Sequence, residues 1–484
     1  MKKKIIITMF IASLFIIGCD NNSDDFNNNQ DLAYDVTPEV LLTNAEKQLS
    51  DQMTTGSVNS SPFRFFDQYW AQALYNTESR YSLVSRAVPD NVWNQLYRDV
   101  MGNLVSAKEY IENETITNQG QHDNKLAIIE VLNVYTFQVL VDTFGDIPYS
   151  EALNPAIKLP KYDNDSDIYP QLITRLDAAI ANLDPSQPSF ESAEIIYNGD
   201  VAQWIKLANS IKVKLGLNLV DVNPTLAQAT IESGYNAGVI LSNEDNATFE
   251  YASTAPNYNP LYGDLVASNR TDFIPAKPFV DALNATNDPR RAVYFTTAPS
   301  TTNYVGGIYA GTNTNYATLS QIGTVFKTPN LSGYLVQAME MNFYLSEAAA
   351  RGFNVGNTAE YYYNQGITQS FNFWNVSGTE LSTYLTQPDI AYATAPGNFQ
   401  QKIGLQVWYS LYNRPMEAWN SYRRLDYPQL VAPSNASASA DGQVPKRLFY
   451  PINERTVNTT SYQNAVEAIG GSDRMRVKIF WDVN

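Results

Sequence analysis

The sequence predicts a mainly α protein in which packed helix pairs form a scaffold and one long segment forms an irregular, loop-rich region. Apolar residues recur at helical spacing through much of the chain, and short polar connections separate these segments. Residues 246–330 differ, because Asn, Thr, Ser, Gly and Tyr dominate there and indicate loops with short helices or strands. An α-solenoid of antiparallel helix pairs fits this pattern, although no repeat of fixed length is visible.

Stripes of apolar residues identify the individual helices. Residues three and four apart share one face of a helix, so each stripe predicts a helix with one buried face. The clearest stripe contains Trp93, Leu96, Tyr97, Val100, Leu104, Ala107 and Ile111. Four others have the same spacing: Leu41, Ala45 and Leu49; Leu126, Ile129, Phe137 and Leu140; Leu172, Leu176, Ile180 and Leu183; and Trp204, Leu207, Ala208, Ile211 and Leu215.

Helix ends are also recognisable. Thr37 is a predicted N-cap, because Pro38 and Glu39 suit the first turn of a helix. Gly145 and Pro148 are expected to end the helix that contains Val141. Helical spacing returns later in the chain, and a further loop zone precedes the C-terminus; the helical ranges are 337–351, 361–371 and 403–412, and the loop is 432–444.

The first residues have the pattern of an export signal. Three lysines precede an apolar run over residues 5–17, which is shorter than the roughly 20 residues needed to cross a membrane, and Gly18 precedes Cys19. Residues 16–19 resemble the bacterial lipobox, in which the cysteine sulfur is lipidated. We therefore expect a signal peptide over residues 1–18 and a lipid anchor on Cys19, with an ordinary signal peptide and a chance cysteine as the alternative. No later segment is expected to span a membrane.

Residues 19–35 are polar and acidic and are expected to form a flexible tether between the lipid and the folded chain. Ser23, Asp24 and Asp25 resemble the acidic signal that directs lipoproteins of Bacteroidetes to the outer face of the outer membrane. The expected location is therefore the outer membrane, with the protein facing the cell exterior. The remaining residues, 36–484, are expected to form one helical domain.

Composition excludes several partners and chemistries. The formal charge of −17 becomes three units more negative when residues 1–18 are removed, and such a surface repels nucleic acid and anionic lipid. Because Cys19 is the only cysteine, no disulfide or Cys/His zinc site is expected. The only histidine, His122, is predicted to be exposed in a loop between helices, with no nucleophile motif nearby. No nucleotide-binding glycine motif is present, so no cofactor is expected.

The acidic residues have more than one interpretation. Residues 163–167 alternate acids like a calcium loop, but Ile168 and Thr174 stand where the turn glycine and the bidentate acid belong. The same acids suit the N-cap and first turn of the following helix, which is the preferred interpretation, and no metal site is predicted. A glycosidase would need two carboxylates at a set separation, and Glu340 and Glu347, two turns apart on one helix, are expected to be structural.

Aromatic residues give the positive signal for ligand binding. The chain has 32 Tyr, 7 Trp and 21 Phe, and many of the tyrosines lie in polar loops. Aromatic faces stack on the C–H faces of sugars, and nearby amides and guanidinium groups bond to hydroxyls, although any single aromatic residue more often serves packing. Three clusters are candidates for ligand contact: Tyr75, Asn76, Arg80 and Tyr81; Tyr258, Tyr262 and Arg270; and Tyr304, Tyr309 and Tyr316.

Several ordered segments carry distinctive motifs: Val141 to Tyr149, with Phe-Gly-Asp-x-Pro; Gln203 to Lys212, with Trp-x-x-x-Ala-Asn-Ser; Asn287 to Arg290; Ser346 to Gly352; Glu417 to Arg424; Arg447 to Glu454; and Phe480 to Asp482. In this order they resemble the SusD/RagB family of nutrient-binding lipoproteins, in particular its SusD-like second branch. The similarity extends from Cys19 to the C-terminus.

The resemblance implies a tetratricopeptide-like helical scaffold, no catalytic activity, and a SusC-like, TonB-dependent outer-membrane barrel as partner. The protein would act as a lid that captures an oligosaccharide or another nutrient and delivers it for import. The shared motifs are expected to serve the fold, with residues such as Asn209 and Arg424 satisfying buried backbone groups between helices.

Two alternatives remain open. The same lid could hold a peptide or another non-sugar nutrient, in which case Arg80 and Arg270 would matter more than the tyrosines. A surface glycoside hydrolase is the other alternative, and it rests only on the abundance of carboxylates.

Overall fold

Helix α3 (Pro38–Thr54) opens the part of the chain that the computed structural model describes, which is residues 36–483. The helix has Pro38 and Glu39 in its first turn, so the predicted start is confirmed. The predicted signal peptide, the lipidation site Cys19 and the tether over residues 19–35 lie outside the described residues.

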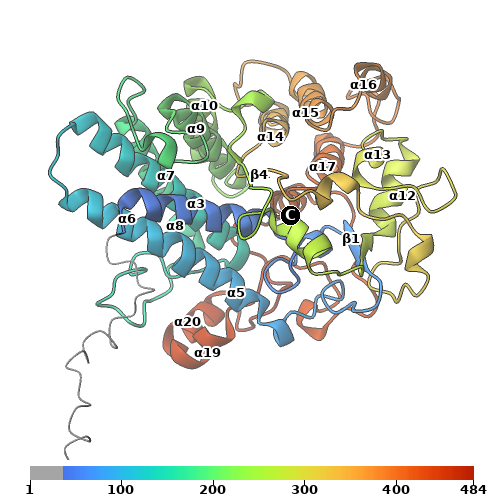
Figure 1. The fold of residues 1–484 in the computed structure, drawn as a ribbon, viewed down its shortest axis with the longest axis horizontal. Helices are drawn as coiled ribbons and strands as arrows, with labels where there is room; N and C mark the ends of the chain where they lie inside the picture. The colour runs from blue at the N-terminus through green and yellow to red at the C-terminus, as the bar shows by residue number, and fades with distance from the viewer. Residues whose placement is uncertain (1–35, 484) are drawn as a thin grey trace, which may run out of the picture. The chain divides into compact units, whose positions relative to one another are not determined.

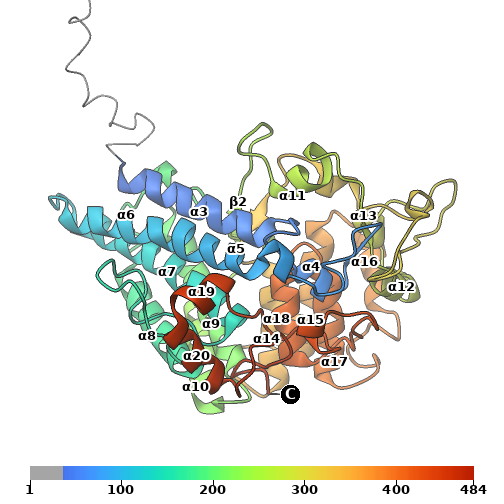
Figure 2. The same cartoon turned by 90° about the horizontal axis from the view of Figure 1, so that it is seen from below.

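The first group of helices packs in chain order. Helix α3 contacts α6 (Gly102–Asn113), and α6 contacts α7 (Gln119–Phe144). Helix α7 then packs on α8 (Asp165–Asn182), and α9 packs on both α8 and α10. Figure 2 shows α3 and α6 running alongside α7. The last two helices of this group are α9 (Val201–Asn218) and α10 (Pro224–Ala237).

A second group of helices continues the packing. Helix α14 (Ala338–Ala350) contacts α9 and so joins the two groups, and it also packs against α15 (Ala359–Phe373). Helix α17 (Phe399–Ser410) contacts α14, α15 and α18 (Pro415–Leu425). In Figure 1 this group lies beside the irregular region that carries α12 and α13. Successive pairwise packing of this kind matches the predicted scaffold of helix pairs.

The clearest predicted helix contains a π-helical segment. The stripe from Trp93 to Ile111 runs through α5 (Val88–Asn94), the π-helical segment η2 (Gln95–Met101) and α6. Leu96, Val100 and Leu104 are four residues apart, and in a helix of 3.6 residues per turn each step of four moves the side chain about 40° further around the helix axis. A π turn has more residues per turn, which keeps side chains four residues apart closer to one face, and all three of these side chains are buried.

The loop-rich region agrees with the prediction for residues 246–330. It contributes one strand to each of two short antiparallel pairs, in which β3 (Phe273–Pro275) joins β1 (Trp70–Gln72) and β2 (Thr248–Phe249) joins β4 (Gly333–Tyr334). The remaining α-helices of the described chain are α4 (Phe63–Phe66), α11 (Pro260–Tyr262), α12 (Lys277–Ala285), α13 (Arg291–Tyr294), α16 (Gly378–Leu385), α19 (Ile452–Val457) and α20 (Thr459–Ala468).

Helix α7 is long and apolar enough to cross a membrane by length and composition, which the sequence interpretation had not allowed for. Its most apolar stretch is 89% buried inside the protein, so α7 is the core helix of the first group. Gly145 ends α7 with a positive φ of 81°, a conformation that glycine adopts without strain, and the predicted helix end is confirmed.

The acids over residues 163–167 serve the start of α8, as the preferred interpretation held. Asn164 is the N-cap and accepts a hydrogen bond from the Ser166 N–H at 3.0 Å. Asp163 accepts from the Ser150 N–H at 2.7 Å, and the Asp165 N–H donates to Asp146 at 2.9 Å. The side chains of Asp163, Asn164 and Asp146 therefore stabilise the turn before α8 and its first residues.

Most of the shared motif residues lie in the interior, but two of them act differently from the expectation. Arg424 donates to the Glu347 carboxylate at 3.0 Å and to the Asn218 side chain at 3.1 Å, so it bonds side chains and not backbone. Asn209 donates to the Ile205 carbonyl one turn back on its own helix. The expectation that these two residues join backbone groups between helices is therefore wrong.

Arg290 offers a direct test of the buried motif charges. Its guanidinium contacts Asp288 at 2.5 Å and Ser410 at 2.7 Å, and neither side chain of the ion pair is exposed. Arg290→Ala leaves the Asp288 charge buried without a partner, so we expect the free energy of unfolding to fall by about 3–5 kcal/mol in urea denaturation. Arg291→Ala, one residue along and partly exposed, is the control and should cost less than about 1 kcal/mol. Equal losses in the two variants would contradict this account.

Candidate ligand-binding site

A two-stranded ribbon positions the first of the predicted aromatic clusters. Strand β1 pairs with β3 in an antiparallel register, and the Ala73 N–H continues the ribbon by donating to the Asp272 carbonyl at 2.7 Å. Trp70 packs beneath this ribbon, with its ring 5.1 Å from that of Phe273. The chain that leaves β1 is therefore held at a fixed place at the surface.

Hydrogen bonds join that segment to two distant loops. The Asn76 and Asn435 side-chain amides both donate to the Ala310 carbonyl, at 3.1 and 3.0 Å. The Arg80 guanidinium donates to the Asn435 carbonyl at 3.0 Å, and the Ser437 N–H donates to the Arg80 carbonyl at 2.7 Å. We call the surface formed by residues 73–80, 305–316 and 428–437 the three-loop face.

The three-loop face exposes a group of large apolar side chains. Tyr75 is 66% exposed, Ile308 62%, Val431 77% and Leu74 55%. Each of the three loops contributes at least one of them. Single exposed apolar residues are common, but a group of them on hydrogen-bonded loops is typical of a binding surface.

A groove of about 600 Å³ lies at the edge of this face. Its volume is in the range of ligand pockets in proteins. Among residues 36–483, none of those that line the groove carries a charge. The lining residues are Gln68, Pro278, Ala282, Tyr309, Leu405, Trp408, Tyr427, Pro428, Gln429, Leu430, Val431, Ala432 and Pro433.

The structure brings the first cluster and Tyr309 together. Tyr81 has no exposed surface; it packs against Phe66 and has its ring 6.4 Å from that of Tyr309, and burial raises the pKa of Tyr81 to about 12. Tyr309 lines the groove, and its hydroxyl donates to the Phe65 carbonyl at 2.5 Å. Tyr316 packs with Tyr309 against the small apolar cluster over the ribbon. Tyr81 thus supports the face from below, and Tyr75 presents its ring outward.

The second cluster and Tyr304 are placed differently. Tyr258 and Tyr262 pack edge to face on each other, with ring centroids 5.3 Å apart. Arg270 forms a two-point ion pair with Asp272, at 3.0 and 2.8 Å, and so lies at the end of the ribbon. The Arg291 guanidinium lies over the Tyr304 ring, with its central carbon 5.4 Å from the ring centroid.

Sequence reasoning missed several residues of the face. Leu74, Ile308 and Val431 are exposed and apolar, and Asn435 carries the bonds that join two of the loops. The loop over residues 432–444 was predicted, but its composition gave no reason to place it beside residues 73–80. Only the pairing of distant segments reveals that proximity.

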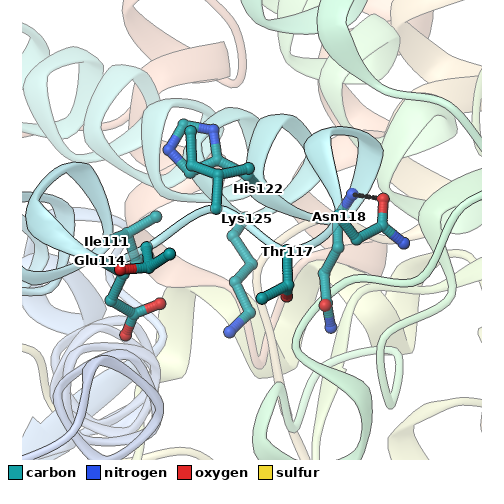
Figure 3. A pocket seen from close by; sticks show the side chains of 9 residues that line it. Ile111, Glu114, Thr117, Asn118, His122 and Lys125 are labelled. Carbon is teal, nitrogen blue, oxygen red and sulfur yellow. Dashed lines mark hydrogen bonds between the residues drawn. The ribbon is translucent and has the colours of Figure 1, made fainter.

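A second, smaller cavity lies between α6 and α7, and Figure 3 shows its lining. Its volume is about 40 Å³, which is too small for a nutrient molecule. The prediction that His122 is exposed in a loop is wrong, because His122 belongs to the first turn of α7, its side chain is 16% exposed, and its ring contacts Asp123 at 3.2 Å. The ring is therefore held at a helix start, away from the three-loop face.

Two adjoining cavities of about 360 and 290 Å³ lie along α6, α7 and α8. They share charged residues that are already paired with each other, with Arg175 bonded to Glu130 at 2.5 Å and Lys108 near Glu112 at 3.7 Å. A ligand there would have to displace these partners, so the three-loop face is the better candidate site.

Two carboxylates with raised pKa values, Glu340 and Asp165, lie in the scaffold, while burial also raises the pKa of Asp67, next to Gln68 of the groove, well above its usual range. Burial raises the pKa of Glu340 to about 7, and burial together with the neighbouring Asp146 charge raises that of Asp165 to about 7. Glu340 contacts Arg414 at 3.3 Å, and Asp165 accepts the Phe480 N–H at 3.0 Å. The expectation that Glu340 and Glu347 are structural is confirmed, because both are buried in ion pairs.

Comparison with known proteins identifies the family. A family model named SusD-like, described as starch-binding and associating with the outer membrane, matches residues 29–451. The chain belongs to this family. The resemblance predicted from the motifs is therefore confirmed, and members of the SusD-like family are binding proteins.

Solved structures of SusD-like proteins share the fold. A structure titled a chitin-binding protein is 26% identical, with a TM-score of 0.81 over 93% of this chain and 100% of that one. A SusD homolog from Bacteroides uniformis is 27% identical, with a TM-score of 0.78 over 92% and 99%. A chitin-binding SusD homolog from Flavobacterium johnsoniae is 24% identical, with a TM-score of 0.78 over 92% and 99%. A search of curated protein sequences found no match.

These likenesses confirm the mainly α, tetratricopeptide-like fold that the sequence predicted, because the similarity covers nearly the whole chain in each case. The family model also spans residues 73–80, 305–316 and 428–437, so the three-loop face lies within the length that the family model matches.

Proposed function

We propose that this SusD-like protein captures a neutral glycan on the three-loop face, and that the glycan is an oligosaccharide. The observation that carries the proposal is the exposed Tyr75 ring on the three-loop face, which also exposes other apolar side chains and has an uncharged groove at its edge. A sugar chain presents C–H faces that pack on such a surface, while its hydroxyls reach amides at the rim. Among the candidate residues, Tyr75, Asn76, Arg80, Tyr309 and Tyr316 would form or support this surface.

The named ligand of one relative supports a glycan. The 26% identical structure is titled a chitin-binding protein, and it covers nearly all of this chain. Chitin oligosaccharides are neutral when fully acetylated, which agrees with a groove lined by uncharged residues within the described chain. They are therefore the first ligands to try, beside starch and cellulose oligosaccharides.

The arginines favour a sugar over a peptide. A peptide ligand would need free charged partners for its termini. Arg270 is already bound at two points to Asp272, and Arg80 is directed at the Asn435 carbonyl. Both guanidinium groups thus have partners within the protein, and a peptide or other non-sugar nutrient is the second candidate.

A hydrolase is disfavoured by the placement of the acids. Glu340 and Asp165, whose pKa values are raised to about 7, are committed to contacts between helices and to the C-terminal segment. In the described part of the chain, no carboxylate lines the groove. We propose that the protein binds its ligand without transforming it.

We also propose how the protein reaches its ligand and where the ligand goes. Residues 1–18 would be removed, Cys19 would carry the lipid, residues 19–35 would form the tether, and residues 36–484 would act as one binding domain at the cell surface. A SusC-like, TonB-dependent barrel would receive the glycan. The support is the lipobox-like sequence together with a family described as associating with the outer membrane.

The contribution of Tyr75 can be measured directly. Tyr75→Ala removes the largest exposed ring of the face, so we expect affinity for the bound oligosaccharide to fall about tenfold, or ~1.4 kcal/mol, in calorimetry. Tyr110→Ala is the matched control, because Tyr110 is 50% exposed on α6, outside the face. An unchanged affinity in Tyr75→Ala, or an equal loss in Tyr110→Ala, would contradict the assignment of the face.

Anchoring and partnership call for a cellular measurement. We expect the wild-type protein to copurify with a large outer-membrane barrel from solubilised membranes, with a glycan detectable by mass spectrometry. Cys19→Ser should shift the protein out of the membrane fraction, because the lipid chains supply the membrane affinity. Recovery of the wild-type protein alone, or membrane retention of Cys19→Ser, would count against this part of the proposal.

A further inference from the structure

Two buried aspartates lie side by side at the start of α8. Asp146 follows the end of α7, Asp165 is the first residue of α8, and their exposed fractions are 5% and 6%. The Asp165 N–H donates to the Asp146 carboxyl group at 2.9 Å, and the two carboxyl groups are within hydrogen-bonding reach of each other. Two acidic groups are therefore buried at one position.

Neither carboxyl group of this pair forms an ion pair in the described part of the chain. Arg447, whose charge acts on Asp146, is bound to Asp473 at 2.8 Å. Asp167 on α8 and Tyr450 also face the pair, and neither is positively charged. Because two adjacent buried carboxylates repel each other, the pair retains a proton that one group donates to the other.

The pair holds the last segment of the chain, residues 472–483, which we call the C-terminal strap. The Phe480 N–H donates to the Asp165 carboxyl group at 3.0 Å. Ile479 is buried, and both Ile479 and Asp165 lie beside Gly145 at the end of α7. The strap thus covers the two acids and bonds to one of them.

The C-terminal strap also supports a segment that adjoins the three-loop face. The Lys446 N–H donates to the Met475 carbonyl at 2.6 Å, and the Met475 N–H donates to the Ser439 carbonyl at 3.2 Å. Residues 438–446 continue directly from the loop over residues 428–437. A strap that loosens would therefore loosen the support of that loop.

We propose that Asp146 and Asp165 form a proton-held latch on the C-terminal strap, and that loss of the shared proton loosens the strap and the adjoining edge of the three-loop face. The latch involves no ligand, so it goes beyond the proposed function and is tested independently of it.

The pH dependence of the latch has a definite sign. Burial, and then the Asp146 charge, raises the pKa of Asp165 to about 7, and burial raises the pKa of Asp146 as well. When the strap opens, water reaches Asp165, and its pKa returns toward the ordinary value of about 4. The shared proton therefore stabilises the closed strap fully below about pH 4, and this stabilisation is lost as the pH rises through about 7.

Hydrogen–deuterium exchange of the full-length protein without ligand measures the latch. Exchange is followed from about pH 5 to pH 8, and each rate is divided by the intrinsic rate at that pH. We expect the opening equilibrium constant of residues 472–483 to rise at least about tenfold between pH 5 and pH 7, with a smaller rise over residues 438–446. Helix α15, in the second group of helices, reports any change in the whole fold.

Substitutions of neighbouring aspartates localise the effect. In Asp165→Asn the amide can donate to Asp146 and accept the Phe480 N–H, so the rise should fall below about threefold. Asp146→Asn should reduce the rise in the same direction, and it serves as the second variant if Asp165→Asn weakens α8. Asp167→Asn is the matched control, because Asp167 is exposed in the same turn of α8, and it should keep the wild-type pH dependence.

Three outcomes would overturn the proposal in whole or in part. An equal rise in the wild type and in Asp165→Asn would overturn the latch. A strap that responds to pH while residues 438–446 do not would support the latch and overturn its link to the three-loop face. If added calcium restores the protection of the wild-type strap at pH 8, and does not restore it in Asp165→Asn, the pair holds a cation and the proton latch is overturned.

Discussion

Buried charges at the junction of α9, α14 and α18 are the constraint on which the scaffold depends. Lys214 contacts Glu417 at 2.6 Å, Arg414 contacts Glu340 at 3.3 Å, and Arg424 contacts Glu347 at 3.0 Å, with every side chain at most 3% exposed. A buried charge without its partner is strongly destabilising, so these helices can pack only in the arrangement that pairs all of them. The two groups of helices are joined at this junction.

The same junction positions the binding surface. Arg64, just before the ribbon, donates to the Tyr412 carbonyl at 2.8 Å, and Tyr412 precedes the helix that carries Arg424. The Tyr69 hydroxyl donates to the Trp408 carbonyl in the last turn of α17, and the Trp70 indole N–H donates to the Tyr412 hydroxyl in the turn that follows. The buried scaffold thus fixes β1, and β1 fixes the loop that presents Tyr75. A rigid base with irregular loops above it allows ligand contacts to vary while the fold stays constant.

The scaffold could be predicted from sequence, and most of the face could not. Periodic stripes such as the one from Trp93 to Ile111 predict that one face of a helix is buried. This periodicity is a local property of the sequence, so it can be read without knowing the fold. Residues 73–80, 305–316 and 428–437 meet only because bonds such as that from Asn435 to Ala310 link segments more than 100 residues apart, and no local pattern encodes that link. The sequence singled out Tyr75, Asn76, Arg80 and Tyr309 as candidates because aromatic and amide residues in polar loops suit sugars. Tyr81 shows the limit of that reasoning, because composition does not distinguish a buried tyrosine from an exposed one.

Hydrogen–deuterium exchange with and without a bound chitin oligosaccharide would test the central claim, that the three-loop face is the ligand surface. The account predicts slower amide exchange over residues 73–80, 305–316 and 428–437, because a bound sugar chain would hold the three loops together, and unchanged exchange in α7 and α14. Ligand binding that slows exchange along α6, α7 and α8 instead, with the three loops unaffected, would contradict the account and move the site to the charged cavities of the scaffold.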